Sequence, residues 1–264
     1  MPIHSFVICA YKESRYLEKC IGSVLRQKSS FESEIIISTS TPNPFIRSIA
    51  DKYGLKLFIN PISGGICSDW RFGYECASGK YVTLAHQDDV YAMNYAETAV
   101  TALEKEKKPL IFFSDYSELR DGCVVTSNRL LFIKRFMLTP LRFHALTGSK
   151  AARRLILSFG NPLCCPSVTY AKDMLPDGFM TSPYKTSLDW DIWERLSQLD
   201  GAFVYHPKTL MLHRIHAESA TTDTIADSTR TNEDYLMFRR FWNPRIASAL
   251  NGLYCESQSS NKTE

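Results

Sequence analysis

Several common catalytic signatures are missing from this chain of 264 residues. It has no G-x-G-x-x-G segment, no G-x-x-x-x-G-K loop and no G-x-S-x-G segment. A dinucleotide-binding fold needs the first, a P-loop enzyme the second and an α/β-hydrolase the third. Glycine itself is scarce, at 12 residues, so any cluster of glycines needs an explanation. These absences weaken assignments as a dehydrogenase, a kinase or an esterase.

The eight cysteines form no metal or disulfide pattern. The sequence has no C-x-x-C and no zinc-ligand spacing, and the one close pair is Cys164-Cys165. Most cysteines lie in apolar or helical stretches, where a free thiol behaves as a small hydrophobic side chain. We therefore expect reduced thiols and a reducing compartment.

Long apolar runs and a strong excess of one charge are also missing. No run approaches the roughly 18–20 apolar residues that a membrane span needs. The first residues lack the basic start of a signal peptide. The formal net charge is only +3, which gives no case for a nucleic-acid partner. We expect a cytoplasmic protein, in contact with the inner face of a membrane at most peripherally.

What the sequence does contain is an alternation of apolar strands and amphipathic helices. Predicted strands cover residues 6–10, 34–38, 56–60, 81–85 and 110–114. Predicted helices cover residues 16–25, 45–53, 68–77 and 95–107, the first with Ser14 as its N-cap. This order predicts an α/β fold in which helices flank a mostly parallel sheet.

Beyond residue 115 the pattern is less regular. Residues 168–170 and 202–205 are predicted strands, and residues 191–199 form a predicted helix. A further helix is predicted over residues 232–241, followed by a frayed polar tail. No repeat and no linker is recognisable, so we interpret the chain as one domain.

Polar segments follow four of the predicted strands, at residues 11–13, 39–41, 63–65 and 86–89. Ligands bind at the carboxyl ends of strands in an open parallel sheet, so these segments are expected to converge. Asp88 and Asp89 are the most informative, because adjacent carboxylates at a buried strand end need a divalent cation or ligand hydroxyls for compensation. The alternative is a solvated turn in which an aspartate caps the next helix.

Two later motifs also admit both a chemical and a structural interpretation. Asp189, at the start of a predicted helix, is either an N-cap or a general base. His213 and His216 either flank a metal or phosphate or are ordinary core or surface histidines. Arg214 between them either pairs with a phosphate or is solvated.

Five segments in order resemble family 2 glycosyltransferases of the GT-A fold. They are residues 6–27 (opening strand and helix), 73–81 (helix to strand), 86–89 (metal motif), 188–196 (acidic catalytic segment) and 213–219 (closing motif). The resemblance covers about residues 5–220 and implies a GT-A fold with a Rossmann-like, mostly parallel central sheet.

The resemblance also implies how the chain is divided. A GT-A domain would occupy residues 1–220, with a nucleotide-binding half at about 1–115 and an acceptor half at about 116–220. Residues 221–264 would form a C-terminal helix and a polar tail.

Site residues are implied position by position. Asp189 would be the catalytic base, and Asp89 would bind Mn²⁺ or Mg²⁺, with His213 or His216 completing the metal or diphosphate site. Residues implied at the nucleotide sugar are Ala10, Tyr11, Glu13, Thr39, Gly65, Arg71 and Asp88. Arg71 stands where the family often has asparagine, and it either reaches the diphosphate or is a solvated helix residue.

The implied reaction is metal-dependent, inverting transfer of one sugar from a nucleotide-diphosphate sugar to an acceptor hydroxyl. A divalent ion would stabilise the departing diphosphate while one carboxylate activates the acceptor, and a single displacement inverts the anomeric centre. The Q-x-x-R-W motif and membrane helices of processive synthases are missing, which indicates transfer of single sugars. The aspartates usual after the second strand are replaced by residues 38–41, Ser-Thr-Ser-Thr, which leaves the nucleotide open.

The acceptor implied by analogy is a glycan or a lipid-linked glycan of cell-surface polysaccharide or lipopolysaccharide synthesis. Basic residues within 129–154 either approach such an acceptor at an anionic membrane or form the solvated face of a covering helix. Residues 235–242 are interpreted as core packing or as a homo-oligomer contact.

Two other functions are considered. A sugar-nucleotide nucleotidyltransferase would carry a glycine- and basic-rich loop after the first strand, where this chain has Tyr-Lys-Glu at 11–13. An inactive nucleotide-binding or scaffold homologue is compatible with the lost second-strand aspartates, but the retained Asp88, Asp89 and Asp189 argue against it.

Overall fold

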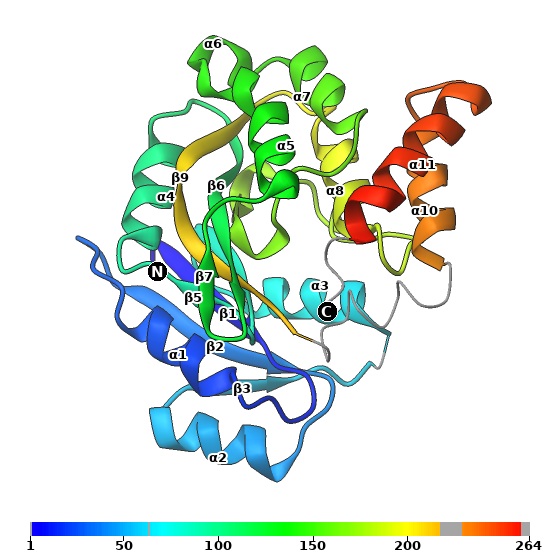
Figure 1. The fold of residues 1–264 in the computed structure, drawn as a ribbon. Helices are drawn as coiled ribbons and strands as arrows, with labels where there is room; N and C mark the ends of the chain where they lie inside the picture. The colour runs from blue at the N-terminus through cyan, green and yellow to red at the C-terminus, as the bar shows by residue number, and fades with distance from the viewer. Residues whose placement is uncertain (1, 63, 217–228, 260–264) are drawn as a thin grey trace.

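Within the residues that the structure describes, 2–62, 64–216 and 229–259, nine strands form one sheet with helices on both faces (Figure 1). The coordinates are a computed structural model. The strand order is β3-β2-β1-β4-β8-β6-β9-β5, and β7 pairs with β6. The strands are β1 (His4–Cys9), β2 (Ser33–Thr39), β3 (Lys56–Ile59), β4 (Tyr81–His86), β5 (Val90–Tyr91), β6 (Pro109–Arg120), β7 (Cys123–Val125), β8 (Val168–Ala171) and β9 (Ala202–Ile215).

The first four strands run parallel to one another, as the apolar runs predicted. β8 is antiparallel to both of its neighbours, β4 and β6, whereas β9 is parallel to β6. The mixed α/β fold with a mostly parallel first half is therefore confirmed. The antiparallel β8 lies where the sequence pattern becomes less regular.

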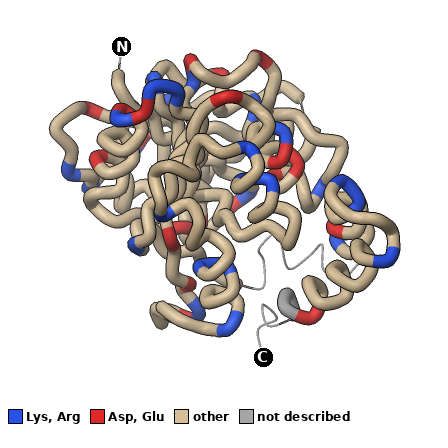
Figure 2. The backbone as a smooth tube through the Cα atoms, turned by 90° about the horizontal axis from the view of Figure 1, so that it is seen from above, with Lys and Arg blue, Asp and Glu red and all other residues tan. Residues whose placement is uncertain are grey.

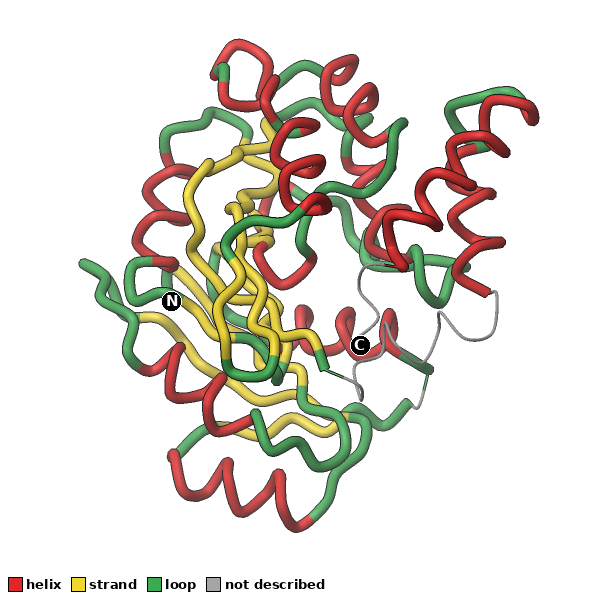
Figure 3. Tube along the Cα trace, in the orientation of Figure 1, coloured by secondary structure: helices red, strands yellow, loops and turns green. Residues whose placement is uncertain are grey.

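Helices pack on both sides of the strands (Figure 3). They are α1 (Leu17–Leu25), α2 (Pro44–Tyr53), α3 (Ile66–Cys76), α4 (Tyr95–Glu104), α5 (Arg129–Met137), α6 (His144–Thr147), α7 (Lys150–Leu157), α8 (Leu188–Leu196), α10 (Thr229–Phe238) and α11 (Pro244–Ser259). Short 3-10 helices are η1 (Thr139–Arg142), η2 (Cys165–Ser167) and η3 (Lys172–Met174).

The two faces of the sheet belong to two hydrophobic cores. Successive strand residues point to opposite faces, so Phe6 and Ile8 pack with α1, α2 and α4. Val7, between them, packs on the other face with α3, α8, α10 and α11. Both faces are covered, which is why β1 and β2 have apolar residues at successive positions in their middle parts.

The order β3-β2-β1-β4 places a topological switch between β1 and β4. From β1 the chain moves outward through β2 to β3, and α3 then carries it back to the other side of β1. The loops after β1 and β4 diverge at this point, where doubly wound folds bind ligands.

Two local predictions at helix ends are wrong. Tyr16, not Ser14, holds the N-cap position of α1, because the Ser14 hydroxyl is engaged with a loop across the sheet edge. The predicted polar tail contains a second helix, α11, and its start is capped by Asn243, whose Oδ1 accepts from the Ile246 N–H at 3.1 Å.

All eight cysteines are free thiols. Among the described residues, none of the helices combines the length and the hydrophobicity that a bilayer-spanning segment needs.

Candidate active site

Side-chain hydrogen bonds join the loops after β1 and β4 at the switch point. Gln87 accepts from the Tyr11 N–H at 3.0 Å and donates to the Tyr11 carbonyl at 3.0 Å. The Ser14 hydroxyl donates to Oδ1 of Asp88 at 3.0 Å. Two predicted site residues, Tyr11 and Asp88, therefore lie in adjoining loops that hold each other in place.

Asp89 is buried behind this contact, with 1% of its surface exposed. Its Oδ1 accepts from the Arg214 N–H at 2.8 Å and lies 3.1 Å from Nδ1 of His213. Burial lowers the pKa of His213, but the charge of Asp89 and their hydrogen bond outweigh burial, so this pKa is raised. The pair ties the end of β4 to the end of β9.

Asp88 is the more open of the two carboxylates. Its Oδ2 lies 3.2 Å from Nε2 of His216, and the two side chains are 23% and 10% exposed. Arg214 supports this loop, because its Nε donates to the Asp88 carbonyl at 2.8 Å and its guanidinium lies 4.2 Å from the Tyr16 ring centroid. Arg214 is itself buried, so the alternative of a solvated arginine is wrong.

The sequence analysis placed four residues at or near the metal, and they form two separate pairs and not one set of ligands: Asp88 with His216, and Asp89 with His213. Among the described residues, no group of three or more His, Cys, Asp and Glu side chains is arranged to hold a metal ion. Asp88 and His216 nevertheless present a carboxylate and an imidazole side by side at a partly exposed position. Mg²⁺ is commonly held by one or two carboxylates together with water and substrate phosphates, so this pair fits an ion shared with a ligand.

Asp189 lies in the first turn of α8, where Ser187 holds the N-cap position, so the N-cap alternative for Asp189 is wrong. Its Oδ1 accepts from the Trp190 N–H at 2.7 Å, and its Oδ2 accepts from Nδ2 of Asn161 at 3.1 Å. Burial raises the pKa of Asp189 above its usual value, and these hydrogen bonds offset the rise only in part. A carboxylate in such a position is a stronger base than a solvated one.

The charges of Asp89 and Asp189 act on the same two neighbouring thiols, the buried Cys164 and the half-buried Cys165. Burial raises the pKa values of Cys164 and Cys165, and the charges of both aspartates add to this rise. Such an effect requires both carboxylates to lie near the thiols. This shared electrostatic effect links the loop after β4 with the start of α8, although they are far apart in the sequence.

Asp69 is a candidate site residue that the sequence analysis missed. Its Oδ2 accepts from the Ser40 hydroxyl at 2.7 Å, and its Oδ1 accepts from Nδ2 of Asn60 at 2.8 Å. Helix α3 thus brings a carboxylate to the carboxyl ends of β2 and β3. At the end of β2, residues 38–41 replace the aspartates that are usual in the family. The signal available in the sequence was an acidic residue in the first turn of the helix after Gly65.

The other predicted donor-site residues surround this edge of the sheet. Ala10 is buried at the end of β1, and Glu13 is exposed in the following loop. Thr39 is buried at the end of β2. Gly65 is the N-cap of α3 and has a φ of 81°, which favours glycine, and Arg71 is a half-buried residue in the middle of that helix.

Glu233 and Asp234 of α10 hold the segment before α8, and no sequence signal pointed to them. Glu233 accepts from the backbone N–H groups of residues 185, 186 and 187 at 2.9, 2.7 and 3.1 Å. Asp234 accepts from the Ser187 hydroxyl at 2.7 Å. These contacts satisfy N–H groups at the start of α8 and so fix the helix that carries Asp189.

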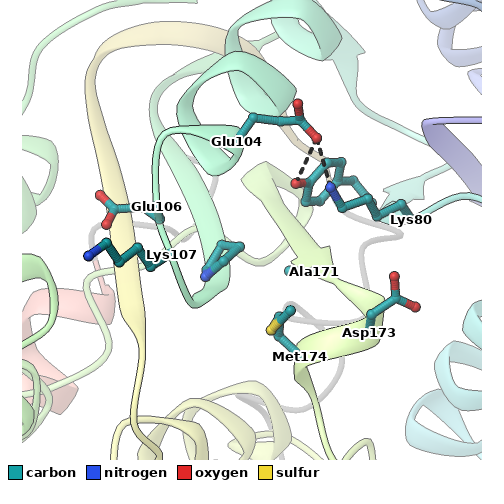
Figure 4. Close-up of a pocket in the computed structure, with 9 residues that line it drawn as sticks. Lys80, Glu104, Glu106, Lys107, Ala171, Asp173 and Met174 are labelled. Atoms are coloured by element: carbon teal, nitrogen blue, oxygen red, sulfur yellow. Dashed lines mark hydrogen bonds and ion pairs between the residues drawn. The ribbon is translucent and has the colours of Figure 1, made fainter.

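A pocket drawn in Figure 4 lies at the opposite end of the strands, beside the first residues of β4 and β6. Its lining includes Tyr81 at the start of β4, Pro109 at the start of β6 and Glu104 at the end of α4. Asp88 follows the other end of β4, about 20 Å along a six-residue strand. The pocket is therefore separate from the candidate active site.

Comparison with known proteins adds three findings. Residues 5–156 match the family described as glycosyl transferase family 2. An uncharacterized glycosyltransferase of Rickettsia prowazekii, RP339, is 27% identical over 245 residues, which cover 88% of this chain and 70% of that protein. The uncharacterized glycosyltransferase EpsJ of Bacillus subtilis is 25% identical over 223 residues, which cover 78% of this chain and 61% of EpsJ.

Among solved structures, Staphylococcus aureus TarS 1–349 in complex with UDP-GlcNAc is similar, with a TM-score of 0.60 at 13% sequence identity. The alignment covers 97% of this chain and 72% of that one. The same TarS segment in complex with UDP gives a TM-score of 0.54 at 11% identity. At such low identity the likeness concerns the fold, and it agrees with the GT-A-type architecture expected from the sequence.

Proposed function

The chain belongs to glycosyl transferase family 2, and we propose that it transfers a single sugar, with inversion, from a nucleotide-diphosphate sugar to an acceptor hydroxyl. The observation that carries this proposal is the meeting of the Asp88–His216 and Asp89–His213 pairs at the switch point between β1 and β4. Switch points of this kind bind nucleotides and their phosphates.

Asp189 is the proposed catalytic base. Its raised pKa favours capture of a proton, and α8 holds it near the same thiols as Asp89. In a single displacement, the acceptor oxygen attacks the anomeric carbon while its proton passes to the Asp189 carboxylate. The bond from that carbon to the diphosphate oxygen breaks, which gives inversion.

Asp88 and His216 are the residues that would hold Mn²⁺ or Mg²⁺. When bound, the ion would neutralise charge that develops on the departing diphosphate. Asp89 and His213, which the sequence analysis placed among the metal ligands, are proposed instead to hold the loop that presents Asp88. The basis is that Asp89 is almost fully buried, whereas Asp88 is partly exposed.

A uridine diphosphate sugar is the proposed donor class, because the similar TarS structures contain UDP-GlcNAc and UDP. The proposed acceptor is a glycan or a lipid-linked glycan of cell-surface polysaccharide or lipopolysaccharide synthesis. The family membership and the glycosyltransferase relatives support this assignment by analogy.

The test is a thermal-shift screen of nucleoside diphosphates and nucleotide sugars, with and without Mn²⁺, followed by a transfer assay. A ligand that binds only the folded protein raises its melting temperature as its concentration exceeds Kd. We expect stabilisation by UDP and by one UDP-sugar that is stronger with Mn²⁺. No stabilisation by any nucleoside diphosphate would contradict the proposal.

Asp189→Asn separates binding from chemistry. We expect donor binding to stay within about twofold, while transfer falls about 100- to 10,000-fold because the base is lost. Asp200→Asn is the matched control, since Asp200 is an exposed carboxylate that pairs only with Lys150 among the described residues. Transfer by Asp189→Asn at the rate of the control would place the base elsewhere.

A further inference from the structure

Lys134, on α5, is connected to the candidate active site by contacts through Tyr116. Its Nζ donates to the Tyr116 hydroxyl at 3.1 Å and lies 5.3 Å from the centroid of that ring. The Tyr116 ring packs edge-on against His213, with centroids 6.1 Å apart. His213 in turn contacts Asp89, so a short chain of side chains connects Lys134 with the loop after β4.

The charge of Lys134 acts on both sides of the site. It opposes the rise that burial causes in the pKa of Asp189 and the rise that Asp89 causes in the pKa of His213. It also lowers the pKa of Cys164, which burial otherwise raises. The ammonium group is thus connected to the Asp89–His213 pair through Tyr116, and its charge also acts on the proposed base.

Lys134 has no carboxylate within ion-pair distance in the part of the chain that the structure describes. The nearby acidic groups are engaged elsewhere: Asp115 with Arg135, Glu118 with Arg120, and Asp89 with His213. A half-buried ammonium without a counter-ion is unfavourable, which makes this position suited to an anionic ligand.

The segment of the chain that contains Lys134 is rich in basic residues. Basic and acidic positions are intermingled over the molecule as a whole (Figure 2). Residues 122–172, in contrast, contain no Asp and no Glu, while they contain Arg129, Lys134, Arg135, Arg142, Lys150, Arg153, Arg154 and Lys172.

We propose that Lys134 binds phosphoryl oxygens in the active site, and this inference rests on the proposed glycosyltransfer. The phosphoryl group belongs either to the diphosphate of the donor or to a phosphate carried by the acceptor. An ammonium group is a suitable ligand for both, since it donates up to three hydrogen bonds to phosphate oxygens.

The experiment compares Lys134→Met, which keeps most of the apolar stem, with Lys134→Arg, which keeps the charge. Lys150→Met is the matched control, because Lys150 is an exposed lysine of α7 that pairs with Asp200. Calorimetry measures the binding of UDP and of uridine, which lacks phosphate, in the presence of Mn²⁺. Transfer kinetics are measured with a neutral sugar acceptor and with a phosphate-bearing acceptor.

If the donor diphosphate is the ligand, Lys134→Met weakens UDP binding about tenfold and leaves uridine binding unchanged. If an acceptor phosphate is the ligand, UDP binding is unchanged and KM rises about tenfold for the phosphate-bearing acceptor alone. In both cases Lys134→Arg recovers most of the loss and Lys150→Met resembles the wild type.

Unchanged UDP binding together with unchanged KM for both acceptors would overturn the inference while leaving the proposed function intact. Failure of the wild-type protein to bind UDP or any other nucleoside diphosphate would instead remove the proposed function. A melting temperature of Lys134→Met within about 2 °C of the wild type shows that the fold is retained. If the variant is less stable than this, Tyr116→Phe, which removes the hydroxyl that holds Lys134, replaces it in the same assays.

Discussion

Asp88 and Asp89 are neighbours in the sequence but lie in very different surroundings. The Asp89 side chain is 1% exposed and accepts hydrogen bonds from β9, whereas the Asp88 side chain is 23% exposed beside His216. One carboxylate therefore holds the fold and the other is available to a ligand. We therefore expect substitution of Asp88 to affect ligand binding and substitution of Asp89 to affect stability.

We expect Asp88→Asn to abolish the Mn²⁺-dependent gain in UDP binding while the melting temperature changes little. Asp89→Asn should instead destabilise the protein by about 1–3 kcal/mol, because a buried ionic hydrogen bond is lost. Calorimetry with and without Mn²⁺ and differential scanning calorimetry measure the two effects. Loss of metal dependence in Asp89→Asn, with stability intact, would contradict this division of roles.

The raised pKa of Asp189 has a consequence for stability. A carboxyl group whose pKa is higher in the folded than in the unfolded protein favours folding in its protonated form. Its ionised form therefore costs stability above the raised pKa, and this cost disappears as the pH falls below the unfolded value of about 3.9.

We accordingly expect Asp189→Asn to be at least as stable as the wild type at pH 7, although it is inactive. The difference in melting temperature should shrink between pH 7 and about pH 4, as Asp189 becomes protonated in the wild type. Thermal melts across this range provide the measurement. A variant that melts below the wild type at pH 7 would show that Asp189 stabilises the fold.

At the scale of elements, the position of Asp189 depends on a contact between two helices. Glu233 of α10 accepts three backbone hydrogen bonds and one from the Thr186 hydroxyl at 2.6 Å, all just before α8. Burial alone would raise the pKa of Glu233, but these hydrogen bonds outweigh it and the pKa is lowered. A lowered folded pKa adds stability above the unfolded value and loses it as the pH falls through the folded value.

Glu233→Gln should therefore destabilise the protein at pH 7 by about 1–3 kcal/mol. As the pH falls below about 4.3, the free energy of unfolding should decrease less steeply in this variant than in the wild type. We expect kcat to fall together with stability, because the start of α8 loses its support. Glu97→Gln is a matched control, since Glu97 also accepts a backbone N–H, from Ser30 at 2.8 Å, but lies on α4. Equal effects in both variants would assign the change to the loss of a negative charge alone.

The elements that could be predicted from the sequence are those that a local pattern determines. Continuous apolar runs identified β1, β2, β3 and β4 because both of their faces are covered. The two-residue strand β5 has no such pattern, and the full length of β9 was missed because three consecutive exposed residues, 207–209, interrupt its apolar pattern. Helix α11 was missed because Asn and Gly in its interior lower its helix propensity.

At the scale of the whole molecule, the candidate site is assembled from loops that the sequence keeps far apart. The family resemblance pointed to the individual aspartates and histidines, but not to which residue pairs with which. Contacts with residues that are distant in the sequence position the side chains of Arg214, Asp69 and Lys134. Such contacts follow from the strand order, and no spacing along the chain encodes them directly.

The C-terminal helices complete this assembly, because they share a core with α8, the helix that carries Asp189. Phe238 of α10 is fully buried, and its ring packs against Trp190 of α8 with centroids 5.0 Å apart. Tyr254 of α11 contacts both rings at 5.7 Å. We therefore expect α10 and α11 to unfold together with the remainder of the sheet and its helices.

Phe238→Ala tests this expectation. Removal of a fully buried phenylalanine should cost about 3–5 kcal/mol and lower the melting temperature by about 6–20 °C in one cooperative transition. Leu236→Ala on the same helix, where the side chain is 49% exposed, should change stability by less than about 0.5 kcal/mol. Scanning calorimetry distinguishes the outcomes. A separate early transition in Phe238→Ala, with UDP stabilising only the later transition, would contradict this expectation. In that case α10 and α11 would form a separate unfolding unit. The support that Glu233 gives to the helix carrying Asp189 would then be lost when that unit unfolds.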